Sequence, residues 1–356
     1  MNILVVKPSS LGDIVHAFPA VDLLRREFPD AAITWLVNDG FTGLIDLLPG
    51  VDDVVSFRRA RWGRLRHWGE LVPFVRDLRQ REFDVAIDFQ GLLRSGLLTW
   101  LSGAPVRIGF RTAREGARFF YNEKAMVPAN LIHAVEKNVF LVRSSLKLGG
   151  EAHIPNLRQH HDFAKFAKQL LQQHQLDEGD GLLAVAVGAR WQSKRWPPAF
   201  FARVLDHVVQ ERPGVAIWLL GSADEREMSD SVSASCRAAE PVNLAGQTNL
   251  GALCEMLRES GALLANDSGP MHLAAALSTP VAALFSSTSP ELTGPYGAGH
   301  RVFVGNCEVG PCFRRTCPLG DPECLESLQP KKVAEALLGM LSRETTASEL
   351  GKETVP

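Results

Sequence analysis

The sequence repeats one local pattern, in which a short apolar run is followed by small or polar residues and then by a helix-like pattern. Each apolar run is short for a helix and suits a strand that is buried on both faces of a sheet. Because strands that alternate with helices form parallel sheets, the pattern predicts doubly wound α/β structure. In the first half of the chain the runs occupy residues 3–6, 33–37, 51–57, 85–89 and 106–109.

The alternation stops and then resumes near the middle of the chain. A helical pattern over 131–148 ends at Gly149-Gly150, and residues 155–161 are irregular and polar. A chain of 356 residues is long enough for two domains. We therefore predict an α/β fold with two Rossmann-like domains that face a central cleft. The predicted segments are an N-terminal domain 1–165, a C-terminal domain 166–328, a helix 329–343 that crosses back to the first domain, and a flexible tail 344–356.

Composition limits the kinds of partner and the location of the chain. The net charge is 38 − 40 = −2, so the overall charge of the molecule does not favour binding to nucleic acid. The apolar run at the N-terminus is too short for a signal peptide, and no run has the length of a membrane span. We expect a cytoplasmic protein, and any membrane role would be peripheral.

The stretch 266–272 (NDSGPMH) predicts a phosphate site. An apolar run over 261–265 leads into it and a helical pattern over 273–277 follows. A helix that starts at the end of a buried strand presents free backbone N–H groups and a positive dipole to a bound anion. A plain helix start, capped by Asp267 or Ser268, explains the same residues equally well.

The loop 7–13 (KPSSLGD) joins the first strand to the helix predicted over 14–28. It matches neither the Walker A pattern nor G-x-G-x-x-G. Asp13 opens the helix, where a carboxylate serves either as a first-turn cap or as a general base above the edge of the sheet. His16 lies one turn further on, and it either lines the site or is structural.

Two groups of arginines follow predicted strands. Five arginines fall within residues 58–66, including Arg59, Arg61 and Arg64, and the second group includes Arg118. A run of charges is commonly a solvated face. Arginine also binds phosphate and carboxylate with two parallel hydrogen bonds, so a polyanionic substrate would explain both groups.

Two charged residues in the second half suit a phosphate and a ribose. Lys194 lies in a predicted strand-to-helix loop and suits a phosphate, although an exposed surface lysine is the alternative. Glu225 could accept hydrogen bonds from a ribose diol, and a first-turn helix glutamate is at least as good an explanation.

Four of the six cysteines form a cluster near the C-terminus. Their spacings are wider than the C-x2-C of a zinc knuckle. In a reducing compartment a disulfide is disfavoured, which leaves reduced thiols, structural zinc or an iron–sulfur cluster. The four residues are Cys307, Cys312, Cys317 and Cys324.

Together these motifs resemble those of the ADP-heptose:lipopolysaccharide heptosyltransferases, glycosyltransferase family 9. Residues 7–16 (KPSSLGDIVH) are similar to the family's K-x-S-S-x-G-D-x-x-H loop, and residues 266–275 (NDSGPMHLAA) to its D-[ST]-G-x-x-H-x-x-A signature. Residues 193–196 resemble the lysine loop of the nucleotide-sugar site. The resemblance extends from residue 1 to about residue 340.

The resemblance implies a GT-B fold and inverting transfer of heptose from ADP-heptose to the inner core of lipopolysaccharide, without a cofactor or metal. It makes Asp13 the catalytic base. The implied donor site comprises Gly12, Lys194, Glu225, Asp267, Ser268, Gly269, Met271 and His272. The implied acceptor site comprises Ser10, His16, Arg59, Arg61, Arg64 and Arg118.

Within the family, two acceptors stay open. Residues 112–115, 120–122 and 133–136 resemble enzymes that add the first heptose to Kdo–lipid A, whereas the cysteine-rich stretch resembles those that add the second. A transferase with another nucleotide sugar or another glycan acceptor is the runner-up. A sugar-binding protein and a nucleotide-sugar epimerase are the other classes compatible with two Rossmann-like halves.

Overall fold

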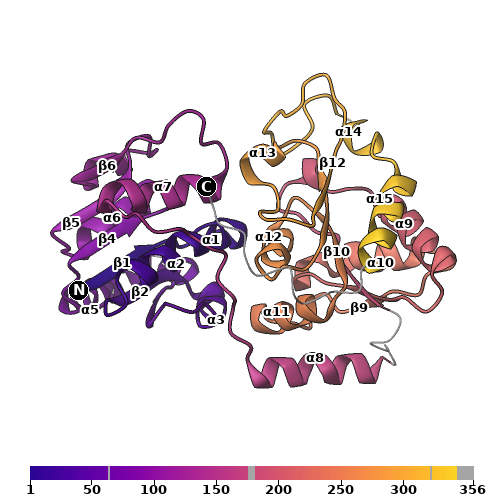
Figure 1. Ribbon diagram of the computed structural model, residues 1–356, viewed down its shortest axis with the longest axis horizontal. Helices are drawn as coiled ribbons and strands as arrows, with labels where there is room; N and C mark the ends of the chain where they lie inside the picture. Colours follow the sequence, from indigo (N-terminus) through magenta and orange to yellow (C-terminus); the bar gives the residue numbers. More distant parts are fainter. Residues whose placement is uncertain (63–64, 175–180, 321–322, 343–356) are drawn as a thin grey trace. The chain divides into compact units, whose positions relative to one another are not determined.

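The computed structural model describes residues 1–62, 65–174, 181–320 and 323–342. The chain divides into two compact units, of which the first comprises Met1–Arg158 and the second begins at Gln159. Each unit contains one six-stranded parallel sheet (Figure 1). The predicted tail, 344–356, lies outside the described residues.

The first sheet has the strand order β3-β2-β1-β4-β5-β6. The order reverses between β1 and β4, and open α/β sheets bind ligands at the carboxyl ends of the strands beside such a switch point. The strands are β1 (Asn2–Val6), β2 (Ala32–Asn38), β3 (Asp53–Phe57), β4 (Val85–Asp88), β5 (Val106–Phe110) and β6 (Glu123–Ala125).

Helices cover the first sheet because both of its faces are apolar. Leu4 and Val6 of β1 lie in one core with Leu78 and Leu98 from two of the helices. Successive strand residues point to opposite faces, and Val5 is fully buried as well. The helices are α1 (Leu11–Val15), α2 (Phe18–Glu27), α3 (Thr42–Ile45), α4 (Arg59–Trp62), α5 (Leu71–Gln80), α6 (Leu93–Leu101) and α7 (Ala134–Leu146), with 3-10 turns η1 (Asp39–Phe41), η2 (Leu65–Glu70) and η3 (Ala117–Phe120).

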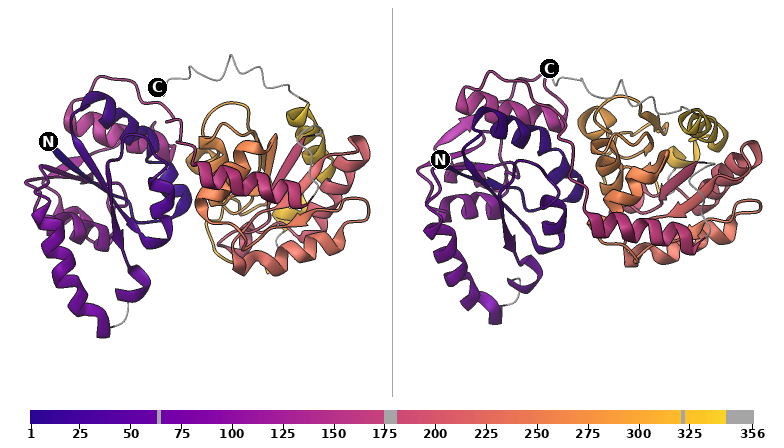
Figure 2. Two further views of the ribbon diagram at one scale, coloured as in Figure 1. Left: turned by 90° about the horizontal axis from the view of Figure 1, so that it is seen from below. Right: turned by 60° about the horizontal axis from the view of Figure 1, so that its bottom comes forward.

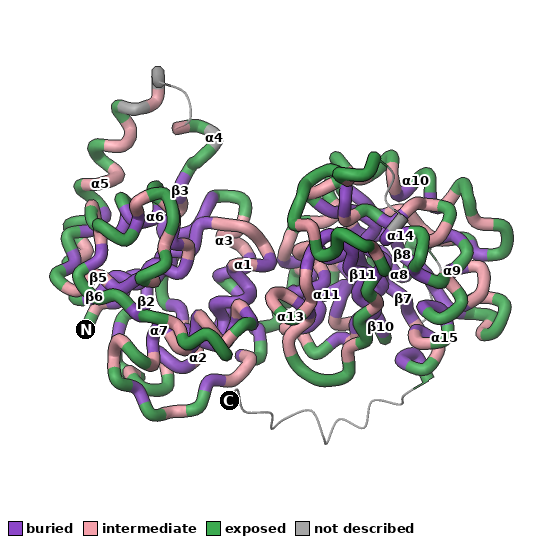
Figure 3. Tube along the Cα trace, turned by 90° about the horizontal axis from the view of Figure 1, so that it is seen from above, coloured by how far each residue is buried: buried purple, intermediate pink, exposed green. Residues whose placement is uncertain are grey.

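The second sheet repeats the same topology. Its order, β12-β11-β10-β7-β8-β9, places the switch point between β7 and β10. Buried residues follow the strands of both sheets (Figure 3). The strands are β7 (Leu182–Ala186), β8 (Ala216–Leu219), β9 (Val242–Asn243), β10 (Ala262–Asn266), β11 (Val281–Phe285) and β12 (Arg301–Val304).

Two layers of helices enclose the second sheet (Figure 1). Helices α9 (Pro198–Glu211), α10 (Arg226–Ser235) and α15 (Pro330–Leu341) contribute to one core with the inward side chains of β7 and β8. Helix α8 (His161–Gln173) lies beside α11 (Leu250–Glu259), as Figure 2 shows, and α11 also contacts α12 (Gly269–Ala276). The short helices α13 (Pro290–Thr293) and α14 (Glu323–Glu326) and the 3-10 turns η5 (Gln192–Lys194) and η6 (Ala223–Glu225) complete the unit.

Helix α15 was expected to cross back to the N-terminal domain. Its apolar residues Val333, Ala334 and Leu337 are fully buried in the core of the second unit. Its neighbours there are α9, β10 and β11. The amphipathic pattern of this helix is therefore explained by packing within its own unit.

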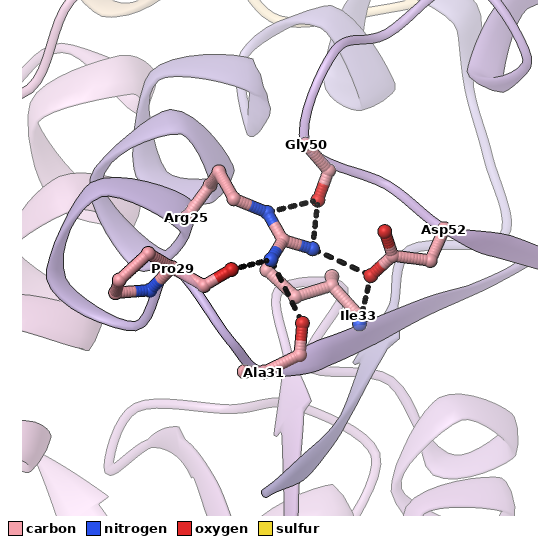
Figure 4. Close-up of polar contacts among 6 residues, drawn as sticks. All are labelled: Arg25, Pro29, Ala31, Ile33, Gly50 and Asp52. Atoms are coloured by element: carbon pink, nitrogen blue, oxygen red, sulfur yellow. Dashed lines mark hydrogen bonds and ion pairs between the residues drawn. The ribbon is translucent and has the colours of Figure 1, made fainter.

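A hydrogen-bonded cluster around Arg25 ties the end of α2 to the strands beside it (Figure 4). Arg25 donates from Nη1 to the carbonyls of Pro29 and Ala31 at 2.7 and 2.8 Å. It donates from Nε and Nη2 to the carbonyl of Gly50, and from Nη2 to Asp52 at 2.5 Å. Gly50 has a φ of +91°, and a Cβ there would lie 3.0 Å from the Cβ of Arg25.

The continuous helix predicted over 14–28 is wrong. The chain forms α1 and α2 with a break at His16 and Ala17, and Pro19 occupies the first turn of α2. Proline cannot continue a helix because its ring clashes with the carbonyl of the residue four positions earlier. The break separates the short helix that carries Asp13 from the longer helix that packs on the sheet.

Candidate active site

Asp13 lies at the carboxyl edge of the first sheet, after β1 at the switch point. Its Oδ2 accepts hydrogen bonds from the backbone N–H of Ser10 at 3.0 Å and from the Ser10 hydroxyl at 2.7 Å. These bonds form a capping box at the start of α1. The structure thus brings Ser10 and Asp13 together, with Gly12 buried between them in sequence. Asp13 is partly exposed, so its carboxylate is both oriented and accessible.

Two buried charged residues, Lys7 and Asp88, lie at the carboxyl ends of the neighbouring strands β1 and β4. Lys7 is 5% exposed and donates from Nζ to the carbonyl of Phe89 at 3.0 Å. Burial lowers the pKa of Lys7, and the charges of Asp13 and Asp88 oppose that shift. Asp88, fully buried at the end of β4, accepts a hydrogen bond from the Tyr121 hydroxyl at 2.5 Å. Burial raises the pKa of Asp88, while its hydrogen bonds oppose the shift.

His16 is 3% exposed and its ring packs edge-on against the ring of His133, with centroids 5.6 Å apart. The carbonyl of His16 accepts a hydrogen bond from Asn138 of α7 at 3.0 Å. His133 caps α7 by accepting from the backbone N–H of Val135. These contacts anchor the end of α1 to α7, and the role of His16 in acceptor binding stays a prediction.

The structure separates the predicted acceptor arginines into two places. Arg59 and Arg61 belong to α4, which follows β3 at the edge of the sheet, and Arg118 belongs to η3, which follows β5. Three strands lie between β3 and β5, so the two strands that these groups follow are about 19 Å apart in the sheet. The β1–α1 loop with Asp13 lies between them in strand order. Arg64 lies outside the described residues.

Arg61 is paired with an acid of its own segment. Its guanidinium bonds both oxygens of Glu70, and Nη2 lies 2.5 Å from Oε1. Hydrogen bonds from Arg61 and from the Trp62 indole lower the pKa of Glu70 to about 2. An anionic acceptor would have to displace Glu70, so Arg61 is a weaker candidate than the exposed Arg59 and Arg118.

At the switch point of the second sheet, Lys194 and Asp267 form an ion pair with Nζ and Oδ2 2.5 Å apart. Their side chains are 16% and 5% exposed. Thr288 donates to the same Oδ2 at 2.5 Å, and the Lys194 ammonium lies 4.8 Å from the centre of the Trp191 ring. Asp267 and Trp191 therefore fix the position of the Lys194 charge at the edge of the sheet.

Helix α12 starts directly after this aspartate. Ser268 is its N-cap residue, and Pro270 lies in the first turn. The backbone N–H groups of that first turn have no acceptor within the helix. The Ser268 hydroxyl is buried and has no hydrogen-bond partner among the described residues. His272 Nε2 lies 4.0 Å from Asp267 Oδ1.

Of the other predicted donor residues, Met271 and Glu225 are the most constrained. Met271 has an exposed fraction of 0%, so only its backbone could meet a ligand, and Gly269 is partly exposed beside it. Glu225 accepts from the backbone and hydroxyl of Ser222 in a capping box. Its side chain also lies over Gly188, where a Cβ would come within 1.7 Å of Oε1. Glu225 thus occupies the carboxyl edge of β7 and β8.

The cysteine-rich segment packs against the lysine loop. Ser193 donates its hydroxyl to the carbonyl of Arg314 at 2.6 Å and its N–H to the carbonyl of Arg315 at 3.1 Å. Phe313 donates to the carbonyl of Ser287 at 2.7 Å. The segment therefore supports the loop that carries Lys194.

All six cysteines lie in the described ranges, and none of them is joined in a disulfide. Burial and the neighbouring cysteines raise the pKa of Cys324, which favours its neutral form. Within the described ranges, no three histidines, cysteines or acids are arranged to hold a metal ion. Over the same ranges, no helix has the length and hydropathy needed to cross a bilayer.

Sequence reasoning missed Lys7, Asp88 and Thr288 as site residues. A charged residue at the carboxyl end of a buried strand is the signal that could have found two of them, because Lys7 directly follows β1 and Asp88 is the last residue of β4. Thr288 lies within a run of hydroxyl residues after β11, and nothing in that run distinguishes it from its neighbours.

Comparison with known proteins gives consistent matches. Residues 72–322 match glycosyltransferase family 9 (heptosyltransferase). The chain is 31% identical to lipopolysaccharide heptosyltransferase 1 of Pseudomonas aeruginosa, over 96% of this chain and 98% of that protein. The structure of Escherichia coli ADP-heptose lps heptosyltransferase II superposes with a TM-score of 0.79, at 25% identity and with 96% and 98% of the two chains covered. E. coli heptosyltransferase WaaC with ADP superposes with a TM-score of 0.74, at 26% identity, covering 96% and 100%.

Two parallel sheets of one topology, together with these structural neighbours, define a glycosyltransferase of the GT-B class. The predicted α/β, GT-B fold is confirmed. The chain belongs to glycosyltransferase family 9, the heptosyltransferase family.

Proposed function

We propose that this enzyme transfers heptose from ADP-heptose to the inner core of lipopolysaccharide, with Kdo–lipid A or the first heptose as the acceptor. The relatives named above support this donor and this class of acceptor. The observation that carries the proposal is the fixed Lys194 ammonium beside the start of α12, which together suit the diphosphate of a nucleotide sugar.

In the proposed reaction Asp13 removes the proton from an acceptor hydroxyl as that oxygen attacks the anomeric carbon. The bond from this carbon to the ADP phosphate breaks and ADP leaves with an additional negative charge. Lys194 and the N–H groups of α12 stabilise that charge. Attack from the face opposite ADP inverts the anomeric configuration. The orientation of Asp13 by Ser10 supports its assignment as the base.

Asp267 has a positioning role in this proposal. A carboxylate next to a diphosphate would repel it, but Asp267 is already neutralised by Lys194 and bonded by Thr288. Ser268, with its unpartnered hydroxyl, is the candidate to donate a hydrogen bond to a phosphate oxygen. The enzyme is proposed to work at the inner face of the cytoplasmic membrane, as a peripheral protein, because the acceptor is a lipid.

The test is ADP release from ADP-heptose, with and without Kdo2–lipid A, for the wild type, Asp13→Asn and Asp13→Ala. Asparagine keeps an oxygen that can accept from Ser10, so it separates loss of the base from loss of the cap. We expect acceptor-dependent release that falls roughly 10²–10⁴-fold in both variants. Full activity of Asp13→Asn would contradict the assignment of the base. Turnover only with a heptosylated core would show that the enzyme adds the second heptose. No turnover with either acceptor would contradict the proposed donor and the proposed acceptor.

A further inference from the structure

Helix α6 in the first unit carries an exposed apolar stripe. Leu93, Leu97 and Trp100 are 49%, 39% and 48% exposed. Their spacing of four and three residues places them on one face of the helix. On the opposite side, Leu98 is buried in the core of the unit. The helix is therefore apolar on both sides, and the sheet covers only one of them.

The 3-10 turn η3 extends this stripe. Gly96 of α6 lets η3 approach closely, because a Cβ at that position would lie 3.0 Å from the Cα of Ala117. The Trp100 and Phe120 rings then lie 6.5 Å apart. Phe119, which precedes Phe120 in the turn, is 74% exposed. Leu93, Leu97, Trp100 and Phe119 form what we call the α6–η3 surface.

The charges beside this surface are predominantly positive. Four exposed arginines, in α6 and in the segment 111–118, accompany a single glutamate, Glu115. That carboxylate accepts a hydrogen bond from the backbone N–H of Leu93 at 3.3 Å, at the start of α6. The neighbouring strand β6 adds one charge of each sign, Glu123 and Lys124. The arginines are Arg94, Arg111, Arg114 and Arg118.

We propose that the α6–η3 surface docks the enzyme on an anionic lipid bilayer. Tryptophan and phenylalanine insert favourably at the boundary between headgroups and acyl chains, and arginines beside them attract anionic headgroups. A second copy of the chain is a poorer partner, since a two-fold contact would place arginines opposite arginines. The chain as a whole has a net charge of −2, so this attraction is confined to the surface. The proposal rests on the proposed function only in that the acceptor would lie in such a bilayer.

The experiment measures binding of the full chain to vesicles of phosphatidylcholine, with and without phosphatidylglycerol. The test variants are the triple substitution Leu97→Ser/Trp100→Ser/Phe119→Ser and the single substitution Arg94→Glu. The control is Val302→Ser/Val304→Ser, which removes exposed apolar side chains from β12 in the second unit. We expect the wild type and the control to bind the anionic vesicles alike. The triple variant and Arg94→Glu should each bind at least about tenfold more weakly.

Activity provides the second readout. With a deacylated, water-soluble acceptor the triple variant should match the wild type, whereas with an acceptor embedded in vesicles its KM should rise. Equal vesicle binding by the triple variant and the wild type would overturn the proposal, as would a wild type that binds no vesicles. A wild-type dimer that dissociates in the triple variant would assign the surface to a second copy instead. If no acceptor is used but vesicle binding follows the expected pattern, the proposed function fails and the surface stands.

Discussion

At the residue scale, the Lys194–Asp267 pair shows how one carboxylate can serve an anion site. An isolated lysine in a loop has many rotamers, and Asp267 selects one of them at 2.5 Å. The same pair affects stability, because the Asp267 carboxylate is only 5% exposed. Without the Lys194 ammonium its buried charge would be uncompensated. Position and stability are therefore coupled at this site.

We predict that Lys194→Met destabilises the second unit by about 3 kcal/mol, because it leaves Asp267 buried without its cation. Adding Asp267→Asn should restore most of this stability, since no uncompensated charge remains. ADP affinity should stay low in both variants. Thermal unfolding and ADP titration check the two parts separately, and recovery of ADP binding in the double variant would contradict the role of Lys194.

The partly buried His300 should impose a pH dependence on stability. Burial lowers its pKa from 6.5 to about 4. The unfolded chain then binds a proton at a higher pH than the folded chain does. The stability contribution is therefore complete above about pH 6.5 and is lost as the pH falls towards 4, by up to about 3 kcal/mol.

His300→Gln should flatten this part of the stability profile. His161, whose side chain is 90% exposed, offers the matched control, and His161→Gln should leave the profile unchanged. Urea unfolding between pH 4 and 7 measures both. Parallel profiles for His300→Gln and the wild type would rule out His300 as the source.

At the element scale, the order of the strands gathers the candidate site. Lys7 follows β1 and Asp88 ends β4, and these neighbouring strands are far apart in the sequence. In the second unit, the loops after β7 and β10 meet in the same way at Lys194 and Asp267. Hydrogen-bonded clusters then hold the connecting segments in place. The cluster around Arg25 is one of these in the first unit (Figure 4).

We predict that Arg25→Lys lowers the free energy of unfolding by about 2 kcal/mol, because a lysine cannot bond three carbonyls and Asp52 in the same planar arrangement. Arg26→Lys is the matched control. Its guanidinium pairs with Asp22 of the same helix and its side chain is 56% exposed, so we expect a change below about 0.5 kcal/mol. Chemical denaturation measures the free energy of unfolding of both variants. Equal losses would mean that the Arg25 cluster contributes no more to stability than the Arg26–Asp22 pair does.

At the scale of the whole molecule, two units of one topology carry different groups. The first has the carboxylate of Asp13 and the second has the Lys194 charge and the start of α12. This division separates the proposed base from the proposed donor site. Binding of ADP should therefore depend on the second unit alone.

We predict that ADP at about 100 times its Kd stabilises the wild type by about 2.7 kcal/mol. Asp13→Asn should keep this shift, whereas Lys194→Met should lose most of it. Calorimetry with and without ADP gives the comparison. A loss of the ADP shift in Asp13→Asn would show that the base and the nucleotide are not separated as proposed.

The sequence alone determined the fold class, because the alternation of buried strands and helices is local and each apolar run reads directly as a strand. It missed the edge strands β6 and β9, which have no continuous apolar run, and β12, whose apolar run covers only residues 302–304. The family signatures also located Asp13 and residues 266–272 without any structure, since both motifs lie at single strand-to-helix turns.

Which side chains come into contact depends on how the strands and loops are arranged in space. Local spacing cannot place Thr288 on Asp267 or Tyr121 on Asp88, because each pair joins separate strands. The same holds for Arg61, whose pairing with Glu70 depends on how the segment after β3 folds back. Helix patterns reveal an apolar face but not what covers it, so the sequence could not distinguish the buried face of α6 from its exposed stripe.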